Sequence, residues 1–284
     1  MQTTKNTNWV YDEMMAYMQQ RSPSHASQTS LIDVLEIYCS ADSQLTKQCI
    51  RQGLKTVRFG LAQGDLSTYD GRCKLYDILM KYRPLHVWMS PKCKAWCRWN
   101  QFNQMRSQEL ALKIQQARAD DEVHLMLCEA VFRWQVLSGD NCHFHLEQPV
   151  GSDMLYQDSL QFILDNALLV RCDMCNAGHL HHPVNKLAIQ KGTQIVTTSQ
   201  ILAQYLNNLR CNGQHEHSQI AGSFSTSQGS FKMPQFTELY TQTFGTRVAK
   251  TILASKKVHE LPVTANLSLT ADGSDQVEEP DLKR

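Results

Sequence analysis

The chain has 284 residues, a hydrophobic fraction of 42% and a formal net charge of +1. This length allows one large domain or two small ones, and the charge excludes a protein that attracts nucleic acid through a strongly basic overall field. Five acids and two bases lie in residues 272–284, so the rest of the chain holds 26 basic and 22 acidic residues, a net charge of +4. That value is compatible with a phosphate backbone as a partner.

The ten cysteines would suggest disulfides in a short secreted chain, but this chain is long and begins without an apolar signal-peptide segment. No run approaches the ~18 apolar residues that cross a bilayer. We therefore expect an intracellular protein without a membrane partner, nuclear if it acts on DNA. Its cysteines are then expected to be reduced, in the core, in catalysis or in metal binding.

The hydrophobic pattern predicts strands that alternate with helices through most of the chain. Short apolar runs predict strands at residues 31–38, 54–59, 85–89, 142–146, 167–171 and 194–198. Helical spacing predicts helices at residues 8–20, 43–52, 71–82, 105–138 with a break at 115–122, 155–166, 200–209 and most of 233–256. This alternation predicts an α/β fold with a Rossmann-like, doubly wound and mainly parallel sheet.

Composition divides the chain into three expected parts. Residues 1–30 are predicted to form an N-terminal helix and a linker, because 21–30 is rich in Ser, Gln and Pro. Residues 31–256 are predicted to form the α/β domain, with helical extensions at both of its ends. Residues 257–284 are polar and acidic, and we expect a disordered tail there.

Two predicted strands end in reactive side chains. Ser90-Pro91-Lys92-Cys93 follows strand 85–89, and Glu147 follows the strand that begins at residue 142. The carboxyl ends of strands are where open α/β sheets gather their ligands. A thiol beside a carboxyl group suits covalent attack on a ring with acid assistance. Three nearby basic residues would favour the thiolate, Lys92, Lys94 and Arg98.

Five segments, taken in order, resemble the catalytic domain of cytosine carbon-5 DNA methyltransferases over about residues 31–225. They are Leu35-Glu36-Ile37-Tyr38-Cys39-Ser40-Ala41-Asp42, Gly64-Asp65-Leu66, Ser90-Pro91-Lys92-Cys93, His145-Leu146-Glu147-Gln148-Pro149, and Asp173-Met174-Cys175-Asn176-Ala177-Gly178 with Gln190-Lys191-Gly192-Thr193. The resemblance is closest to divergent versions in retrotransposon-type polyproteins of protists such as dinoflagellates.

The resemblance implies a fold of the S-adenosylmethionine-dependent methyltransferase type and an activity on cytosine in DNA or RNA. Cys93 would add to ring carbon 6, and Glu147 would hold the base at ring nitrogen 3. The target base would be flipped from its duplex or offered single-stranded. The residues expected at the S-adenosylmethionine site are Glu36, Tyr38, Ser40, Asp65 and Ser90.

The chain departs from the family pattern at several positions. Ser40 and Asp42 stand where the family prefers glycine, and Lys92 stands where it has proline. The arginine pair of the late motif is missing, with Lys191 the nearest basic residue, and no long target-reading segment follows residue 199. Two alternatives therefore stay open. One is a methyltransferase of relaxed specificity. The other is a non-catalytic nucleic-acid or protein-interaction module of a mobile element, which zinc could stabilise.

Two short Cys and His clusters predict a zinc site. Cys172 and Cys175 form a Cys-x2-Cys pair, and Cys211, His215 and His217 lie in a polar loop 35 residues further on. Four such ligands suit tetrahedral structural zinc, although the spacing is not that of a finger domain. We expect Cys175, Cys211 and His215 to bind, with Cys172 or His217 as the fourth ligand. The alternative is two separate half-buried thiols and a solvated histidine loop.

Each candidate also has a structural interpretation. Cys93 could be a small buried thiol, Glu147 a capping or ion-pairing group, and Asp65 the acceptor of an Asx turn. The run 96–103 has a composition that suits base stacking, but we expect the tryptophans to pack in the core and in loops, at positions 88, 96, 99 and 134. A zinc deaminase is excluded, because the His-x-Glu precedes the cysteines in that class and the cysteine spacing differs. A Cys-His hydrolase is too unspecific a pattern to argue.

Overall fold

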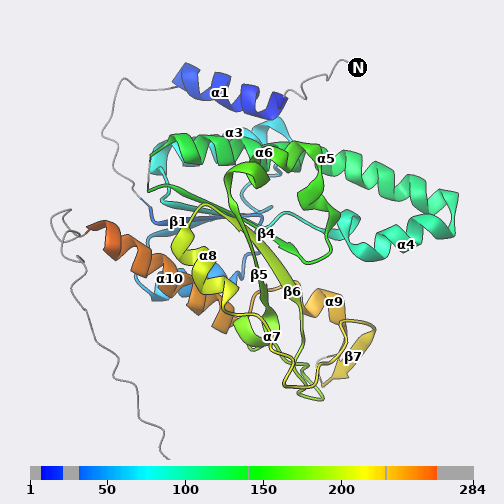
Figure 1. The fold of residues 1–284 in the computed structure, drawn as a ribbon. Coiled ribbons are helices and arrows are strands. Elements are labelled where there is room, and N and C mark those ends of the chain that lie inside the picture. Colours follow the sequence, from blue (N-terminus) through cyan, green and yellow to red (C-terminus); the bar gives the residue numbers. More distant parts are fainter. Residues whose placement is uncertain (1–7, 22–31, 140, 228, 261–284) are drawn as a thin grey trace, which may run out of the picture.

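A computed structural model describes residues 8–21, 32–139, 141–227 and 229–260 of the chain. A six-stranded sheet with the order β2-β1-β3-β4-β6-β5 forms its centre (Figure 1). The strands are Val34–Ile37 (β1), Thr56–Phe59 (β2), His86–Met89 (β3), His143–Pro149 (β4), Leu168–Asp173 (β5) and Gly192–Thr197 (β6). Strands β2, β1, β3 and β4 are parallel, and β6 is antiparallel to both of its neighbours. The predicted α/β class with a mainly parallel sheet is confirmed.

Helices cover both faces of this sheet (Figure 1). They are Trp9–Arg21 (α1), Gln44–Arg51 (α2), Tyr69–Tyr82 (α3), Arg98–Arg106 (α4), Gln108–Leu137 (α5), Asp158–Asn166 (α6), Met174–Ala177 (α7), Gln200–Asn207 (α8), Met233–Phe236 (α9) and Gln242–Glu260 (α10). Two short 3-10 helices, Lys94–Trp96 (η1) and Asp153–Tyr156 (η2), and a small hairpin of Ser223–Thr226 (β7) and Gly229–Lys232 (β8) complete the described elements.

The alternation of side chains along each strand produces two hydrophobic cores. Leu35 and Ile37 of β1 face a core that is covered by α1, α3, α5 and α6. Val34 of β1 and Trp88 of β3 face the opposite core, which α2, α8 and α10 cover. Because both faces are buried, the strands read as nearly continuous apolar runs, which is why the sequence pattern located them.

The strand order indicates where a ligand could bind at the carboxyl edge of the sheet. The chain passes from β1 outward to β2 and then returns to the other side of β1 to form β3, so the order reverses between β1 and β3. The crevice outside such a reversal is the usual ligand position in open α/β sheets. Strand β5 ends at Asp173, which pairs with Gly192 at the start of β6, so the connection between them also lies at this edge.

The long helix differs from its prediction. Helix α5 runs unbroken through residues 115–122, where the polar composition had predicted a break. The first half of α5 extends beyond the sheet together with α4, so its polar side chains face solvent and do not interrupt the helix (Figure 1). Side-chain pairs four residues apart, Lys113 with Glu109 and Gln116 with Asp120, support it. Helix α4 was not predicted separately, and it has no buried residue.

The boundaries of the three predicted parts shift at both ends. Helix α1 packs into the main core through Val10, Met14 and Met18, so it belongs to the body of the protein. Helix α10 continues to Glu260, past the predicted boundary at residue 256. Arg21, the first residue of the predicted linker at 21–30, ends α1, and the rest of that linker lies outside the described residues. Of the predicted tail at 257–284, the part from residue 261 also lies outside them.

A buried ion pair fastens α1 to the body. Arg72 donates from Nε and Nη2 to the two carboxylate oxygens of Glu13, at 2.8 and 2.6 Å. Only 4% of the Arg72 side chain is exposed, and the Tyr76 hydroxyl also donates to Glu13. Removal of the carboxylate would therefore leave an uncompensated buried charge.

We predict that Glu13→Ala lowers the free energy of unfolding by about 3 kcal/mol, because breaking one side of a buried pair strands its partner. The matched control is Glu109→Ala, which removes an exposed pair with Lys113 and should cost less than about 1 kcal/mol. Urea denaturation of both variants measures the difference. Equal losses in the two variants would contradict a supporting role for the Arg72 pair.

Candidate functional site

The loop that carries Cys93 is fastened on both sides. Before Cys93, the side-chain amide of Gln148 on β4 donates to the carbonyl of Pro91 at 2.9 Å, and it accepts from Ser152 at 3.0 Å. After Cys93, the Trp96 indole donates to Asp121 of α5 at 3.0 Å. The loop is therefore held between the end of β4 and the long helix, as a nucleophile would require.

Glu147 is a buried carboxyl group near the end of β4. Its residue is only 7% exposed, and Oε1 has no hydrogen-bond partner among the described residues. Burial raises the pKa of this carboxyl group, while the charge of Lys191 and the hydroxyl of Tyr240 act in the opposite direction. An orphaned oxygen in such a position carries a desolvation cost that a ligand could relieve.

Cys93 lies close enough to Glu147 for their charges to interact. The thiol is half-buried, and burial, followed by the Glu147 carboxylate, raises its pKa to about 11. Lys191 is the cation that opposes this rise. The predicted activation by Lys92, Lys94 and Arg98 is corrected, because these three exposed side chains are not among the leading influences on the thiol. Without a ligand, Cys93 is a neutral thiol at neutral pH.

Tyr240, in the loop before α10, lies beside Glu147 of the Cys93 and Glu147 pair. Its hydroxyl lies 2.7 Å from the Ser90 hydroxyl and accepts from the Trp88 indole at 3.0 Å. Trp88 also donates to Ser90 at 3.1 Å. The predicted site residue Ser90 is thus engaged within the protein. The sequence carries no local signal for Tyr240, which is 150 residues from Ser90 along the chain.

A hollow of about 420 Å³ opens beside Tyr240, on the side of β8 and α9. Its lining is mostly apolar, and includes Leu180, Phe231, Phe236 and Leu239. The residues that line it do not include Cys93 or Glu147, so the hollow adjoins the pair without containing it.

The turn after β1 combines a strained backbone with a buried polar contact. Tyr38 has a φ of 64°, a left-handed conformation that costs a side chain energy and that clusters at functional sites. Its hydroxyl lies 3.1 Å from Nδ1 of His124 on α5. Burial raises the pKa of Tyr38 and lowers that of His124, so both groups are neutral at neutral pH.

Glu36 has a structural role in this turn. Its carboxylate accepts from the Ser43 hydroxyl at 2.7 Å and from the backbone N–H of Thr46 at 3.0 Å, at the first turn of α2. A carboxylate at a helix N-terminus is stabilised by the unpaired N–H groups there. Burial nevertheless raises its pKa. Glu36 was expected at the cofactor, but these contacts occupy its oxygens, so it shapes the turn and does not face outward.

Asp65 forms the Asx turn that the sequence left open as an alternative. Its Oδ1 accepts from the backbone N–H of Ser67 at 2.9 Å and from the Ser67 hydroxyl at 2.7 Å, and these bonds lower the pKa of Asp65. No described residue bonds to its second oxygen, and the side chain is exposed. Ser40 is exposed as well. Both side chains are therefore open to a ligand at the carboxyl edge of the sheet.

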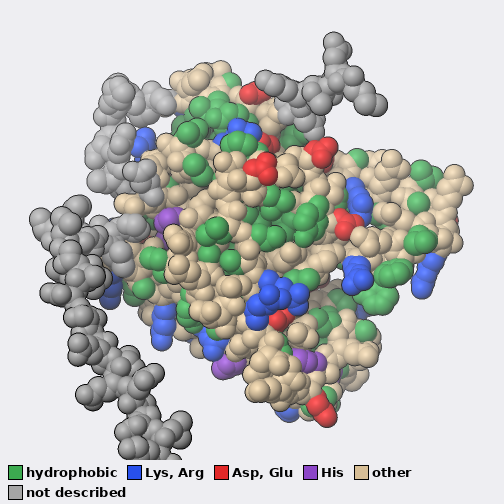
Figure 2. Space-filling model, in the orientation of Figure 1, with side chains coloured by type: hydrophobic (Ala, Val, Ile, Leu, Met, Phe, Trp, Pro, Cys, Tyr) green, Lys and Arg blue, Asp and Glu red, His purple; other side chains and the backbone are tan. Residues whose placement is uncertain are grey.

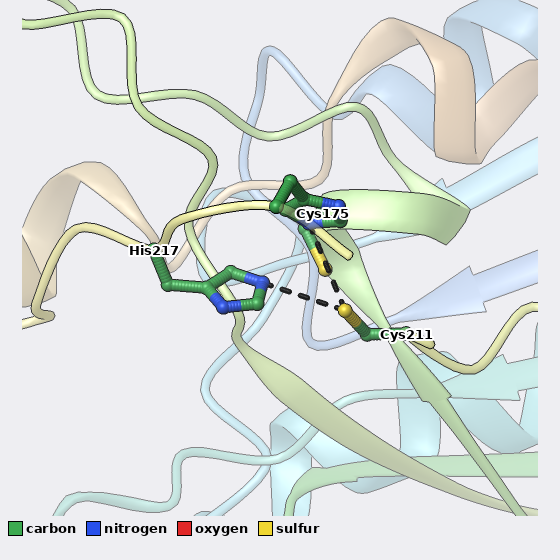
Figure 3. Close-up of side chains that lie close together, drawn as sticks. Cys175, Cys211 and His217 are labelled. Atoms are coloured by element: carbon green, nitrogen blue, oxygen red, sulfur yellow. Dashed lines mark hydrogen bonds between the residues drawn. The ribbon is translucent and has the colours of Figure 1, made fainter. Parts of the chain in front are cut away.

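The predicted metal ligands converge on one point from two segments of chain. Cys175, Cys211, His215 and His217 place one ligand atom each within 4.8 Å of one another. Figure 3 shows the Cys175 side chain, from α7, and the His217 ring both directed toward the Cys211 sulfur. His217 is therefore the fourth member of a group that could hold a metal ion. Cys172 is separate from the group, because its side chain is fully buried in the core beneath α8.

Helix α4 carries an exposed aromatic stripe directly after the Cys93 loop. Trp99, Phe102 and Met105 are 70%, 50% and 85% exposed and recur every three residues along the helix. The expectation that the tryptophans pack in the core and in loops is confirmed for Trp88 and Trp96, which are buried, and for Trp134, which packs against the main core. It is wrong for Trp99, which is exposed on α4. In Figure 2, hydrophobic and basic side chains gather where α4 and the first half of α5 extend from the body.

The same segment is free of acidic residues. None occurs in the sequence from Ile78 to Gln108, whereas four exposed bases lie on the loop and on α4, Lys92, Lys94, Arg98 and Arg106. Among the described residues, no ion pair neutralises any of the four. This part of the surface is positive although the chain as a whole is nearly neutral.

Comparison with family models, with curated proteins and with solved structures finds no match to this chain. In the part of the chain that the structure describes, no helix has both the length and the apolar character that crossing a membrane requires.

We predict that Glu147→Gln increases the rate at which iodoacetamide alkylates Cys93 at about pH 8.5, because loss of the neighbouring carboxylate lowers the thiol pKa. The measurement is mass spectrometry of the peptide that contains Cys93, which separates this thiol from the other nine. Glu109→Gln, on the exposed start of α5, is the control and should leave the rate unchanged. An unaltered rate in Glu147→Gln would show that the two groups do not share one site.

Proposed function

We propose that this protein is a methyltransferase-like enzyme that uses S-adenosylmethionine and acts on cytosine in nucleic acid, with DNA as the expected substrate. The observation that carries the proposal is the buried Glu147 carboxyl group with an unpartnered oxygen, beside the thiol of Cys93 at the adjacent strand end. This arrangement matches the two roles that the family resemblance assigned to these residues.

The chemistry of cytosine explains why both groups would be needed. The ring is a poor electrophile, so addition of a thiol to carbon 6 is easier when nitrogen 3 receives a proton or a hydrogen bond. Burial raises the pKa of the Glu147 carboxyl group, which favours the protonated form that can donate at that nitrogen. As the Cys93 sulfur bonds to carbon 6, its proton passes to solvent and carbon 5 becomes nucleophilic. Carbon 5 could then take the methyl group that a bound S-adenosylmethionine would supply. Loss of the carbon 5 proton to solvent and return of the nitrogen 3 proton to Glu147 would then release the sulfur and restore the ring.

The charge of Lys191 acts on both Cys93 and Glu147, and the Tyr240 hydroxyl acts on Glu147. Lys191 lowers the pKa of both Cys93 and Glu147, so its charge stabilises whichever of them is ionised during the reaction. Its ammonium group is held by the carbonyl of Thr237 at 2.9 Å. We assign Lys191 the electrostatic role that the missing arginine pair would have in the family.

The cofactor would lie at the reversal of strand order between β1 and β3, which is the ligand position of a Rossmann-like sheet. Tyr38, Ser40 and Asp65 lie around this position, and the exposed Ser40 and the free oxygen of Asp65 could accept or donate bonds to hydroxyl and amino groups. When bound there, S-adenosylmethionine supplies an electrophilic methyl group. Ser90 would contribute through its place at the end of β3, and Glu36 through the turn that it supports.

Nucleic acid would lie along α4. Exposed Trp99 and Phe102 can stack on unpaired nucleobases. The four basic side chains of the loop and helix, Lys92, Lys94, Arg98 and Arg106, can contact phosphates. Because this surface follows Cys93 directly in the chain, a strand bound on it passes close to the nucleophile.

A second candidate function is binding without catalysis. The observation that favours it is the pKa of Cys93, raised to about 11, which leaves little thiolate at neutral pH. The positive, aromatic surface of α4 serves a nucleic-acid-binding module equally well. Trapping on a substrate analogue separates the two candidates.

We predict a covalent adduct between Cys93 and a single-stranded oligonucleotide that contains 5-fluorocytosine, formed only with S-adenosylmethionine present, because fluorine at carbon 5 blocks release of the sulfur. Denaturing gel electrophoresis measures the adduct. Cys93→Ser should abolish it, whereas Cys97→Ser, a neighbouring half-buried thiol, should retain it. Calorimetric titration with S-adenosylhomocysteine provides a separate reading of the cofactor site. Absence of an adduct despite tight oligonucleotide binding would favour the binding module.

We also predict that Trp99→Ala weakens binding of single-stranded oligonucleotide about 5- to 150-fold, which corresponds to the ~1–3 kcal/mol of one base–aromatic stack. Fluorescence anisotropy at several salt concentrations measures affinity, and wild-type binding should fall as salt rises. The control is Tyr205→Ala, which removes a partly exposed ring from α8 on the opposite face of the sheet. Equal affinities for wild type and Trp99→Ala would place the nucleic acid elsewhere.

A further inference from the structure

We propose that Cys175, Cys211, His215 and His217 form a tetrahedral zinc site that holds the segment ending in Lys191 at the carboxyl edge of the sheet. The zinc site itself is independent of the proposed function, whereas its consequence for Lys191 rests on that function.

The geometry of the four side chains fits a single ion. The Cys211 sulfur lies 3.7 Å from Nε2 of His215 and 3.4 Å from Nε2 of His217. Ligands at ~2.3 Å for sulfur and ~2.0 Å for nitrogen, arranged as a tetrahedron, lie about 3.5 Å apart. All four ligand atoms lie within 4.8 Å of one another, so small adjustments would bring each to bonding distance.

The donor set selects the metal. Two thiols and two imidazoles are the soft and borderline ligands that zinc prefers, and a hard cation such as magnesium or calcium would require oxygen ligands. With all four positions supplied by the protein, the ion has no open position for water or substrate. The site is therefore of the structural kind.

Surrounding hydrogen bonds position the ligands from both segments. The backbone N–H of Cys211 donates to Asp173 at 2.9 Å, and the side chain of Asn176 donates to the carbonyl of Arg210 at 3.0 Å. The N–H of Gly213 points to the Cys211 sulfur at 3.3 Å, a bond that stabilises a thiolate. These contacts bring α7 and the loop after α8 together around the site.

The same segments extend to Lys191. The N–H of Met174, beside the ligand Cys175, donates to the carbonyl of Lys191 at 2.9 Å. Ala188 pairs with the ligand His217 through a β-bridge. The N–H of Ser218 donates to the carbonyl of Ala188 at 2.7 Å. Both ends of the segment 188–191 thus attach to residues at the metal site. Zinc would fix that segment, and with it the position of Lys191 beside Glu147.

Elemental analysis of the full chain, prepared without a His tag, tests the site directly. We expect about one zinc per chain in the wild type and in Cys142→Ser, a half-buried thiol at the start of β4, and less than ~0.2 in Cys211→Ser. Chelation should lower the melting temperature of the wild type and of Cys142→Ser by several degrees. Less than ~0.2 zinc per wild-type chain, with an unchanged melt in chelator, would overturn the zinc site.

A second measurement covers a variant that fails to fold. Wild-type protein reconstituted with cobalt should show the intense visible bands of a tetrahedral ion with thiolate ligands, and octahedral bands would overturn the geometry. Hydrogen exchange then tests the link to Lys191. Chelation should speed exchange of the amides in 188–191 while the amides of β1 keep their protection, and unchanged exchange in 188–191 would overturn the link although zinc binds. None of these readings depends on methyl transfer, so failure of the proposed function leaves them intact.

Discussion

The parallel pairing of β3 with β4 is the constraint on which the candidate site depends. His86 pairs with His143 and Met89 with Leu146, so the loop after β3 and the last residues of β4 leave the sheet side by side. The Gln148 side-chain amide then donates a hydrogen bond to the carbonyl of Pro91, which holds the loop after β3 against the end of β4. Glu147, one residue earlier on β4, faces the opposite side of the strand and is carried into the interior beside Cys93.

A chain of buried polar groups keeps this pairing in register. His86 lies 2.9 Å from His145, and His145 lies 2.7 Å from the Thr197 hydroxyl on β6. Burial lowers the pKa of His145, so its ring is neutral, with one nitrogen as donor and the other as acceptor. A slip of one residue would move these rings to the other face and leave their nitrogens unpaired in an apolar core.

Burial opposes ionisation of the two groups at the end of this pair. Burial raises the pKa of both Glu147 and Cys93, and each negative charge would further oppose ionisation of the other. Lys191 is the one described group that favours ionisation of both, and its segment is anchored at the Cys and His cluster. The candidate site and the Cys and His cluster are therefore joined through a short length of backbone between α7 and β6.

The sequence by itself determined the α/β class, the six strands of the sheet and the placement of Cys93 and Glu147 at the ends of strands. Strands that are buried on both faces are apolar throughout, and carboxyl ends of adjacent parallel strands share one edge, so both features follow from local pattern. Three members of the Cys and His cluster that could hold a metal were also predictable, since Cys and His in two short polar segments are the pattern of a zinc site.

Only the tertiary structure decided the rest, because it depends on contacts between distant residues. His217 belongs to the Cys and His cluster and Cys172 does not, since the direction of a side chain on β5 is set by the core beneath α8. Tyr240 and Lys191 reach the site from the late part of the chain, and the thiol pKa follows from burial and Glu147 rather than from its basic neighbours in sequence. Trp99 is exposed and Trp96 buried, three residues apart, because one faces α5 and the other faces solvent.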